Sequence, residues 1–300
     1  MTPRLTIGIT TRNRPQALEA CLRSLQALDG LAPEVLIFDD GSDPSATIAG
    51  AALEVRLLRD PSSPGYIVGR NRLVREAAAP FVLLLDDDTR VLPDGSVARA
   101  LAVLERDPQV AAVAFAQAEA DGRPWPAAMQ ASRADYACVV PSFIGFAHLL
   151  RRDVFLRLAG YREDFIFYGE EKDFCLRLID AGYRTVYLPD ARVSHLPDAA
   201  GRSMTRYLRF VARNDCLTAL YNDPFPRVLW MLPARFFLYF RMRRGWGVRD
   251  PWGWVWLARV VARVAARPGF ARTPVSRATV KRWREIRLAP PRYDLPGSMA

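Results

Sequence analysis

Long apolar runs are missing from this sequence of 300 residues, although half of its residues are hydrophobic. No window holds about 18 uninterrupted apolar residues, so we expect no helix that crosses a membrane. Residues 1–4 lead directly into a strand-like run, so we also expect no secretory signal peptide. The hydrophobic residues are therefore free to build a sizeable core in one large domain or two small ones.

Cysteine, histidine and lysine are scarce as well. The four cysteines stand far apart and form no C-x-x-C pair, which argues against a zinc cluster and a disulfide framework and favours reduced thiols in a cytosolic protein. Lys172 and Lys281 are the only lysines, so nearly all basic side chains are arginines. The chain has two histidines, and one of them, His195, closely follows a predicted strand.

Acidic residues are rare in the last third of the chain. Residues 201–300 carry 20 of the 42 basic side chains but only five of the 32 acidic ones, a net charge of +15, whereas residues 1–200 have a net charge of −5. Six of the seven tryptophans also lie in this last third. The composition predicts two parts, a catalytic body (residues 1–200) and a basic, aromatic-rich helical extension (residues 201–300).

Short apolar runs alternate with helical patterns in the body. The runs typical of strands are residues 5–10, 35–38, 55–58, 81–85, 110–115 and 185–188, the last closed by Pro189. The patterns typical of helices are residues 15–25, 69–79, 97–105, 151–158 and 173–181. Because the first elements follow the order strand, helix, strand, strand, helix, strand, we predict an α/β fold with a mostly parallel central sheet flanked by helices. Residues 117–140 show weak periodicity and are expected to form a mobile loop.

Two of the predicted strands end in clustered carboxylates. Asp86, Asp87 and Asp88 follow an apolar strand, and three adjacent acids repel one another unless a cation lies among them. Ligands of open α/β sheets bind at the carboxyl ends of strands, and oxygen ligands suit Mg²⁺ or Mn²⁺, although a solvated acidic turn is the alternative. Asp39 and Asp40 end an earlier strand. An Asp there commonly accepts a hydrogen bond from a ribose or a base, but an ordinary Asp-Gly turn explains this pair equally well.

Five motifs occur in a fixed order along the body. They are Thr11-Arg12-Asn13-Arg14-Pro15, Asp39-Asp40-Gly41-Ser42, Gly69-Arg70-Asn71, Leu85-Asp86-Asp87-Asp88 and Tyr168-Gly169-Glu170-Glu171-Lys172-Asp173. Over about residues 4–200, their order and spacing resemble the family 2 glycosyltransferases. The resemblance implies the GT-A nucleotide-diphospho-sugar transferase fold. The Q-x-x-R-W motif of processive polysaccharide synthases is absent from the sequence, so we expect transfer of one sugar per encounter.

The resemblance also implies roles for individual residues. The residues expected to contact the nucleotide-sugar donor are Thr11, Asp39, Arg70, Asp86 and Asp87. Asp88, the last acid of a D-x-D motif, is expected to bind the divalent metal directly, and His195 matches a histidine that commonly completes the metal site. A lone histidine is more often structural, so both interpretations of His195 stay open.

Glu170, Glu171 and Asp173 lie at the start of a predicted helix. The helix dipole alone favours acids there, by tenths of a kcal/mol to about 1 kcal/mol, and this is the structural alternative. In the family this is the acidic catalytic motif. The resemblance therefore implies that Glu171 takes the proton from an acceptor hydroxyl as that oxygen attacks the anomeric carbon. One displacement of this kind inverts the anomeric configuration, while the metal would offset the charge on the leaving diphosphate.

The basic extension interleaves arginines with aromatic residues. Arg206, Arg209 and Arg213 recur at helical spacing, and tryptophans and arginines flank the short apolar runs that follow. This pattern fits helices that lie at an anionic membrane surface, at the inner face of the cell membrane. The alternative is a helical subdomain packed on the body with a solvated arginine face. No nucleic-acid motif accompanies the basic residues, so we expect no nucleic-acid partner.

The sequence thus predicts a metal-dependent, inverting glycosyltransferase that moves a sugar from a nucleotide-sugar to a glycan or lipid-linked acceptor in cell-envelope glycan or glycolipid synthesis. A sugar nucleotidyltransferase has a similar layout but needs a Gly-rich phosphate loop after the first strand, where this chain has Thr10-Thr11-Arg12-Asn13. A non-catalytic, membrane-associated partner that retains the fold is the other alternative. Metal-dependent binding of a nucleoside diphosphate would distinguish an enzyme from such a partner.

Overall fold

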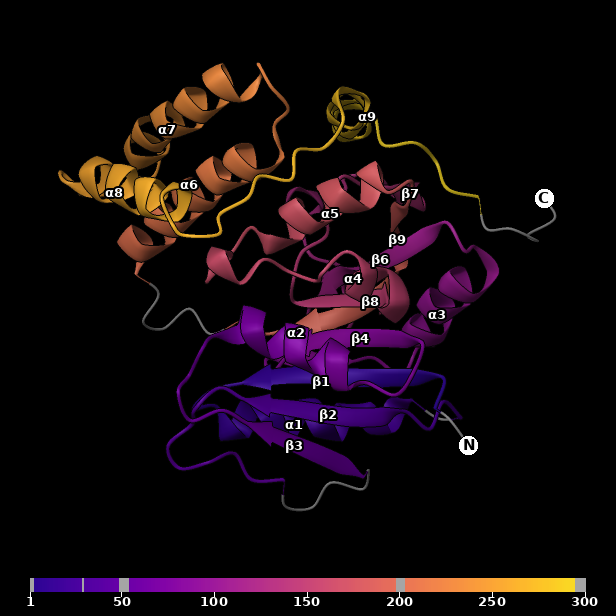
Figure 1. Cartoon of the computed structure of the whole chain (residues 1–300). Helices are drawn as coiled ribbons and strands as arrows, with labels where there is room; N and C mark the ends of the chain where they lie inside the picture. The colour runs from indigo at the N-terminus through magenta and orange to yellow at the C-terminus, as the bar shows by residue number, and fades with distance from the viewer. Residues whose placement is uncertain (1–2, 29, 49–53, 198–202, 295–300) are drawn as a thin grey trace.

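The computed structural model describes residues 3–28, 30–48, 54–197 and 203–294 (Figure 1). Within these residues, nine strands form one sheet in the order β3-β2-β1-β4-β8-β6-β9-β5, and β7 pairs with β9. The strands are β1 (Leu5–Thr11), β2 (Glu34–Asp39), β3 (Val55–Arg59), β4 (Phe81–Asp86), β5 (Thr89–Val91), β6 (Val110–Ala118), β7 (Cys138–Val139), β8 (Ala147–Arg151) and β9 (Arg184–His195). The helices of the body are α1 (Pro15–Ser24), α2 (Tyr66–Glu76), α3 (Ser96–Arg106), α4 (Arg152–Arg157) and α5 (Glu170–Asp180).

The half of the sheet that carries the acidic strand ends is parallel. β1 pairs in parallel with β2 and β4, and its register sets Thr11 beside Asp39 and Thr10 beside Asp86. Because parallel strands end at the same edge, the acids that end β2 and β4 lie on either side of the end of β1. In the other half, β8 runs antiparallel to both β4 and β6, and β5 and β7 run antiparallel to β9. The sheet as a whole is therefore mixed.

β9 is longer than the sequence indicates, so the expected strand end at Pro189 is wrong. The pairing of β6 with β9 shifts between Phe115 and Ala116, whose partners are Leu188 and Arg192. The residues between these partners bulge out of the ladder, and a proline in a bulge removes no ladder hydrogen bond. The strand thus continues past the proline and carries His195 to the edge where the acids of β4 lie.

The segment 117–140 is more regular than the expected loop. β6 extends through Gln117 to Ala118, a short 3₁₀ turn spans Ala127–Met129, and β7 pairs with β9. The Gln130 side chain accepts a hydrogen bond from the Gln117 backbone N–H (2.8 Å) and donates to the Trp125 carbonyl (3.1 Å). These elements span only two or three residues beyond β6, which is too short to leave a periodic pattern in the sequence.

The core consists of two apolar layers, one on each face of the sheet. Leu18 of α1 and Leu101 of α3 pack with Ile7 of β1 on one face. Leu73 of α2 and Phe174 of α5 pack with Leu84 of β4 on the other face. The alternation of side chains along a buried strand sends successive residues into the two layers, which is why β4 reads as a continuous apolar run.

Helices α6 (Met204–Asn222), α7 (Val228–Gly245) and α8 (Gly253–Ala265) pack against one another beside the body, and α9 (Arg277–Leu288) returns to α5 (Figure 1). A small cluster around Leu208, Tyr239 and Leu257 joins the first three. The expected boundary between the two parts, near residue 200, lies outside the described residues. None of the described helices combines the length and the hydropathy that a membrane span requires.

Candidate active site

Two carboxylates from the end of β4 and one histidine from the end of β9 converge at one edge of the sheet. Asp86, Asp88 and His195 each offer a ligand atom, and these atoms all lie within 4.8 Å of one another. The pairing of β5 with β9 sets Thr89 opposite His195, so the ring lies next to Asp88, with Nε2 3.6 Å from the Asp88 Oδ1 atom. The structure therefore brings together the two residues that the sequence assigned to a metal, and it adds Asp86.

The chemistry of this cluster fits a divalent cation. Asp88 Oδ1 is buried and has no hydrogen-bond partner among the described residues, which is unusual for a carboxylate oxygen. Two carboxylates and an imidazole are a ligand set that Mn²⁺ or Mg²⁺ accepts. Asp88, Asp86 and His195 are thus the residues that would hold the ion.

Gln117, Trp125 and Phe146 fix the orientation of the His195 ring. The Gln117 Oε1 atom lies 2.7 Å from His195 Nδ1, and a side-chain carbonyl can only accept, so Nδ1 carries the proton. The ring is stacked between Trp125, at a centroid distance of 5.4 Å, and Phe146, at 4.9 Å. The ring's other nitrogen, Nε2, faces Asp88, so the ring is pre-set as a ligand. Nothing in the sequence pointed to Gln117, because its role follows from the pairing of β6 with β9.

Asp87 is bonded to β1 and to the loop that follows it. It accepts hydrogen bonds from the Thr11 hydroxyl (2.8 Å) and from Arg14 (2.9 Å), and Arg14 also reaches Asp88 at 3.0 Å. Burial raises the pKa of Asp87 to about 6, although the hydrogen bonds from Thr11 and Arg14 favour its ionised form. Thr11 and Asp87, both expected to contact the donor, are therefore bonded to each other. Arg14 was missed as a site residue, although it belongs to the first motif.

Asp39 is fully buried and organises the loop that follows β2. Its carboxylate accepts hydrogen bonds from the backbone N–H groups of Ser42 (2.8 Å) and Ala46 (3.0 Å). Burial alone would raise the pKa of Asp39, but these hydrogen bonds outweigh it and the pKa is lowered. The neighbouring Asp40 accepts from the Gly65 N–H at 2.8 Å. Both acids thus bond to backbone at the edge of the sheet.

Arg70 connects the acids of β4 to the acids of α5. This side chain is 3% exposed, and its guanidinium donates to Glu170 (2.9 Å), to Asp86 (2.7 Å) and to the Gly145 carbonyl (2.7 Å). It also lies over the Tyr66 ring, 4.6 Å from the centroid. A planar guanidinium with a fixed fork of donors can hold several partners at once. Arg70 was expected to contact the donor, and in the structure it connects Asp86 of β4 to Glu170 of α5.

Glu171 lies beside this arginine. A Cβ atom on Gly145 would collide with Glu171 Oε1 and approach Arg70 Nη1 to 2.9 Å, so a larger residue there would displace the Glu171 carboxylate. Burial raises the pKa of both Glu170 and Glu171, and the Glu171 charge raises the pKa of Glu170 further. A carboxylate with a raised pKa is a stronger base near neutral pH. Glu171 remains partly exposed, whereas Glu170 is fully buried.

Asp173 faces the interior and joins α5 to its surroundings. Its carboxylate pairs with Arg177 at 2.8 Å, accepts a hydrogen bond from Asn222 of α6 at 2.7 Å and contacts Arg162. Asp173 is fully buried, and both of its oxygens are occupied by these partners. The geometry thus separates Asp173, which holds helices together, from Glu171, which lies next to the cluster of acids.

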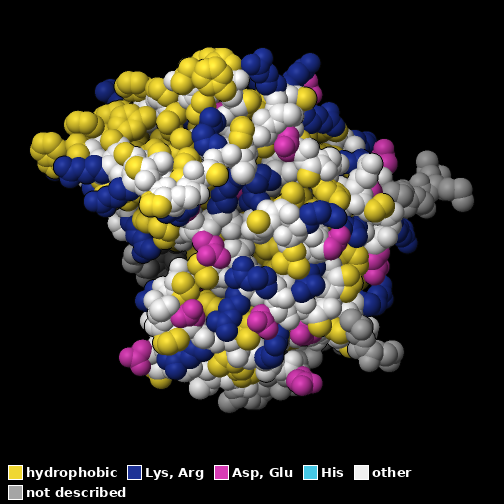
Figure 2. All heavy atoms as spheres, in the orientation of Figure 1, with side chains coloured by type: hydrophobic (Ala, Val, Ile, Leu, Met, Phe, Trp, Pro, Cys, Tyr) yellow, Lys and Arg dark blue, Asp and Glu magenta, His cyan; other side chains and the backbone are white. Residues whose placement is uncertain are grey.

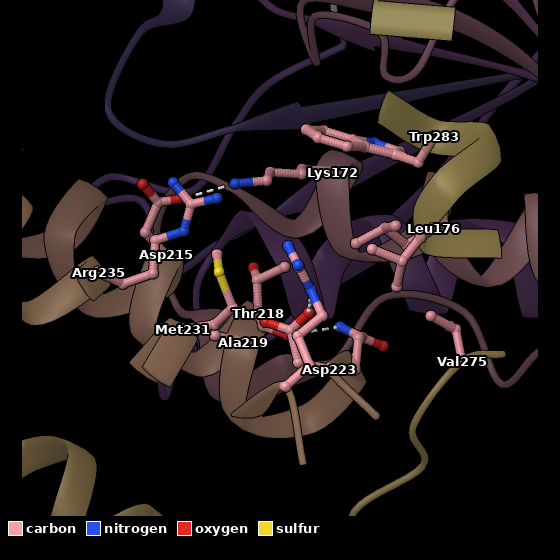
Figure 3. Close-up of a pocket in the computed structure, with 13 residues that line it drawn as sticks. Lys172, Leu176, Asp215, Thr218, Ala219, Asp223, Met231, Arg235, Val275 and Trp283 are labelled. Carbon is pink, nitrogen blue, oxygen red and sulfur yellow. Dashed lines mark hydrogen bonds and ion pairs between the residues drawn. The ribbon is translucent and has the colours of Figure 1, made fainter. Parts of the chain in front are cut away.

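A separate pocket lies on the other side of α5, between α5, α6, α7 and α9 (Figure 3). Lys172 and Asp215 form an ion pair at its wall (2.6 Å), and the ring of Trp283 of α9 lies over Lys172, with Nζ 5.8 Å from the ring centroid (Figure 3). Its volume is about 40 Å³, which holds one or two water molecules and no sugar nucleotide. None of the metal, donor or base candidates lines it.

Comparisons with known proteins show the family of this chain. The family model described as glycosyl transferase family 2 matches residues 6–160. A pre-mycofactocin glycosyltransferase of Mycobacterium tuberculosis is 30% identical over 205 residues, which cover 64% of this chain and 42% of that protein. An N-acetylglucosaminyltransferase of Sinorhizobium fredii is 28% identical over 236 residues, 69% of this chain and 56% of that protein. The chain spans about half the length of these relatives.

Solved structures show the same fold. A mannosyltransferase of Pyrobaculum calidifontis, in complex with GDP-Man and Mn²⁺, has a TM-score of 0.56 at 19% identity and covers 90% of this chain and 77% of that one. TarS 1-349 of S. aureus, in complex with UDP-GlcNAc, has a TM-score of 0.61 at 16% identity, and the match covers 87% of this chain and 81% of that one. These likenesses confirm the predicted GT-A fold. Because the family model matches more than half of its residues, the chain belongs to glycosyl transferase family 2.

Proposed function

We propose that this glycosyltransferase moves one sugar from a nucleotide-sugar donor to an acceptor hydroxyl, with inversion at the anomeric carbon and with a divalent metal. The observation that supports this reaction is the convergence at one sheet edge. Asp86, Asp88 and His195 form a ligand set there, and Arg70 connects it to the glutamates of α5. Nucleotide-sugars and Mn²⁺ in the complexes of structurally similar proteins support the same donor class and cofactor.

The carboxyl edge of β1, β2 and β4 is the place for the donor. Thr11 and Asp39 lie side by side at the ends of β1 and β2, where a nucleoside would rest against the loop that Asp39 orders. Asp87 and Arg14 brace that edge through their bonds to Thr11 and Asp88. When bound, the metal would neutralise the diphosphate of the leaving group. The metal ligands would be Asp88 and His195, with Asp86.

Glu171 is the proposed base. It lies on the first turn of α5, next to Arg70 and Gly145, and is partly exposed, so a hydroxyl can reach it. It would take the acceptor proton as the acceptor oxygen forms its bond to the anomeric carbon and the bond to the diphosphate breaks. Glu170, locked to Arg70 and Tyr66, would keep the first turn of α5 in place. Asp173, also assigned to this motif, would anchor the helix.

The acceptor that we propose is a lipid-linked or cell-envelope glycan, and the place of reaction is the inner face of the cell membrane. The basic and aromatic character of α7 and α8 supports this location, since such helices bind anionic membrane surfaces. One sugar per encounter is expected because the processive Q-x-x-R-W motif is absent from the sequence.

Calorimetric titration with UDP-, GDP- and dTDP-sugars, with and without Mn²⁺, tests the donor and the metal together. We expect one nucleotide class to bind in the presence of metal and to bind at least about tenfold more weakly without it. Asp88→Ala removes a metal ligand and should abolish both the metal effect and transfer, because the diphosphate loses its counter-charge. The matched control is Asp121→Ala, which removes an exposed surface acid. Metal-independent binding, or full activity of Asp88→Ala, would contradict the metal assignment.

A further inference from the structure

The outer face of α7 is apolar. Trp230, Pro233, Ala234 and Phe237 follow one another at helical spacing and are all exposed. Trp230 is 55% exposed and Phe237 67%, whereas Tyr239 of the same helix is fully buried. A helix on the surface of a globular protein normally turns its polar side to solvent. The exposed side of α7 from Trp230 to Phe237 therefore lacks the water-facing residues expected of a packed subdomain.

The beginning of α8 extends this apolar surface. Trp252 is 71% exposed and Trp254 41%. Figure 2 shows hydrophobic side chains gathered over the region of α7 and α8, with lysine and arginine side chains at its margin. Exposed apolar areas of this kind, rimmed by polar residues, mark interaction sites. We call this surface the α7–α8 face. It consists of the apolar residues Leu229, Trp230, Phe237, Trp252 and Trp254 and the exposed arginines Arg241, Arg244, Arg259 and Arg263.

The charge of the α7–α8 face has one sign. Neither α7 nor α8 contains an aspartate or a glutamate. Within the part of the chain that the structure describes, Arg241 and Arg244 of α7 and Arg259 and Arg263 of α8 pair with no carboxylate at 4.0 Å or less. The face thus offers apolar rings and unneutralised guanidinium groups together, and its partner must provide apolar depth and negative charge.

We propose that the α7–α8 face docks on an anionic lipid bilayer, with Trp230, Phe237 and Trp252 at the boundary between head groups and acyl chains and the arginines on the head groups. Tryptophan and arginine side chains are suited to this boundary, since each has an apolar body and a polar end. A second copy of the chain fits less well, because a two-fold contact would bring the arginines of both copies together. The inference rests on the membrane location proposed above, not on the transfer chemistry.

A row of aromatic contacts connects this face to the candidate base. Trp246, at the end of α7, stacks on Tyr207 of α6 at 5.3 Å, and Tyr207 meets the edge of Tyr168 at 4.9 Å. Tyr168 immediately precedes the turn into α5, where Glu171 lies. A chain docked through the α7–α8 face would therefore hold α5 and Glu171 in a fixed orientation relative to the lipid surface, where the head group of a lipid-linked acceptor would be found.

Co-sedimentation of the full chain with vesicles tests this docking. The vesicles contain either phosphatidylcholine alone or phosphatidylcholine with phosphatidylglycerol, and we expect binding to the second kind. Trp230→Ala combined with Phe237→Ala should weaken binding at least about tenfold, because two large side chains lose their apolar burial. Arg241→Gln combined with Arg244→Gln should weaken binding about fivefold per arginine and only on anionic vesicles. Leu288→Ala, which truncates a residue of α9 that is 69% exposed, is the matched control and should bind unchanged.

Three outcomes would overturn the proposal: unchanged binding of the Trp230 and Phe237 variant, equal binding to neutral vesicles, or a dimer in solution that this variant dissociates. Circular dichroism checks that the variants remain folded. Metal-dependent nucleotide binding, measured on the same variants without vesicles, should be unchanged. If the unmodified chain binds nucleotide with metal but does not bind anionic vesicles, only the proposed docking is wrong. If the unmodified chain binds no nucleotide, the proposed reaction is wrong.

Discussion

In the body, Arg70 is 3% exposed and contacts two carboxylates, whereas Arg241 and Arg244 of α7 are exposed or partly exposed and, among the described residues, pair with none. The aromatic residues show the same contrast. Tyr161 is buried in the core, while Trp252 is 71% exposed. In the body these groups find their partners within the fold, whereas the α7–α8 face leaves such groups for an external partner.

This contrast shows how one residue type serves two purposes. A buried arginine must meet carboxylates within the fold, because an unpaired buried charge is very costly. It therefore fixes the geometry of whatever it contacts. An exposed, unpaired arginine costs the fold little free energy, because water solvates its charge, and it fixes no geometry until a partner binds. We thus expect changes in the body to alter chemistry and stability, and changes on the α7–α8 face to alter location only.

The largest effect is expected from Glu171→Gln, which keeps the shape of the side chain but removes its ability to accept a proton. Turnover should fall about 10²- to 10⁴-fold, the range that general base catalysis contributes, while metal-dependent donor binding persists. Steady-state transfer assays measure turnover, and calorimetry measures donor binding. Trp252→Ala, which changes the α7–α8 face, is the control and should leave donor binding unchanged. A Glu171→Gln enzyme with full turnover would remove Glu171 from the mechanism.

Arg70→Met should have the largest effect on stability. The change leaves the fully buried Glu170 without its cation and should lower the free energy of unfolding by about 3–5 kcal/mol, the cost of breaking a buried ion pair. Urea unfolding followed by circular dichroism measures it. Adding Glu170→Gln should recover part of the loss, because no unpaired buried charge then remains. If the single and double variants were equally unstable, the pairing would not be the cause.

The succession of the first strands and helices along the chain and the place of the acids at strand ends were predictable, because both follow from local patterns. Apolar runs ending in Asp39 and Asp86 mark two buried strands, and parallel pairing brings their ends together. The partners of these acids were not predictable. Arg14 reaches the site through tertiary packing, and Gln117 reaches it through the pairing of β6 with β9. The bulge in β9 that contains Pro189 leaves no recognisable pattern in the sequence.

The outer face of α7 was also hidden from pattern analysis. Periodicity separates the inside of a helix from the outside only when one side is polar. In α7 both the buried Val228 and Tyr239 and the exposed Trp230 and Phe237 are apolar. The sequence therefore left a packed subdomain and a membrane-binding helix as equal alternatives. Only the packing against α6 and α8 shows which side chains face outward.

A smaller effect is expected from Gln117→Leu. The change keeps a similar volume but removes the acceptor that holds the His195 Nδ1 proton, so Nε2 is no longer fixed as the ligand nitrogen. Affinity for Mn²⁺ alone should fall about 10- to 100-fold, measured from the electron paramagnetic resonance signal of free Mn²⁺. Gln117→Glu retains an acceptor and should bind within a few-fold of the original chain. If the leucine variant and the original chain bound Mn²⁺ with equal affinity, the Gln117 side chain would not be needed to orient the His195 ring.

The smallest effect on stability is expected from Arg241→Gln combined with Arg244→Gln. Neither arginine has a carboxylate partner among the described residues, so each change should alter the free energy of unfolding by less than about 0.5 kcal/mol, as is usual at exposed sites. Urea unfolding under the conditions used for Arg70→Met gives the direct comparison. A loss of several kcal/mol would mean that these arginines are part of the fold. The contrast between an internally neutralised body and an outward-facing basic surface would then no longer hold.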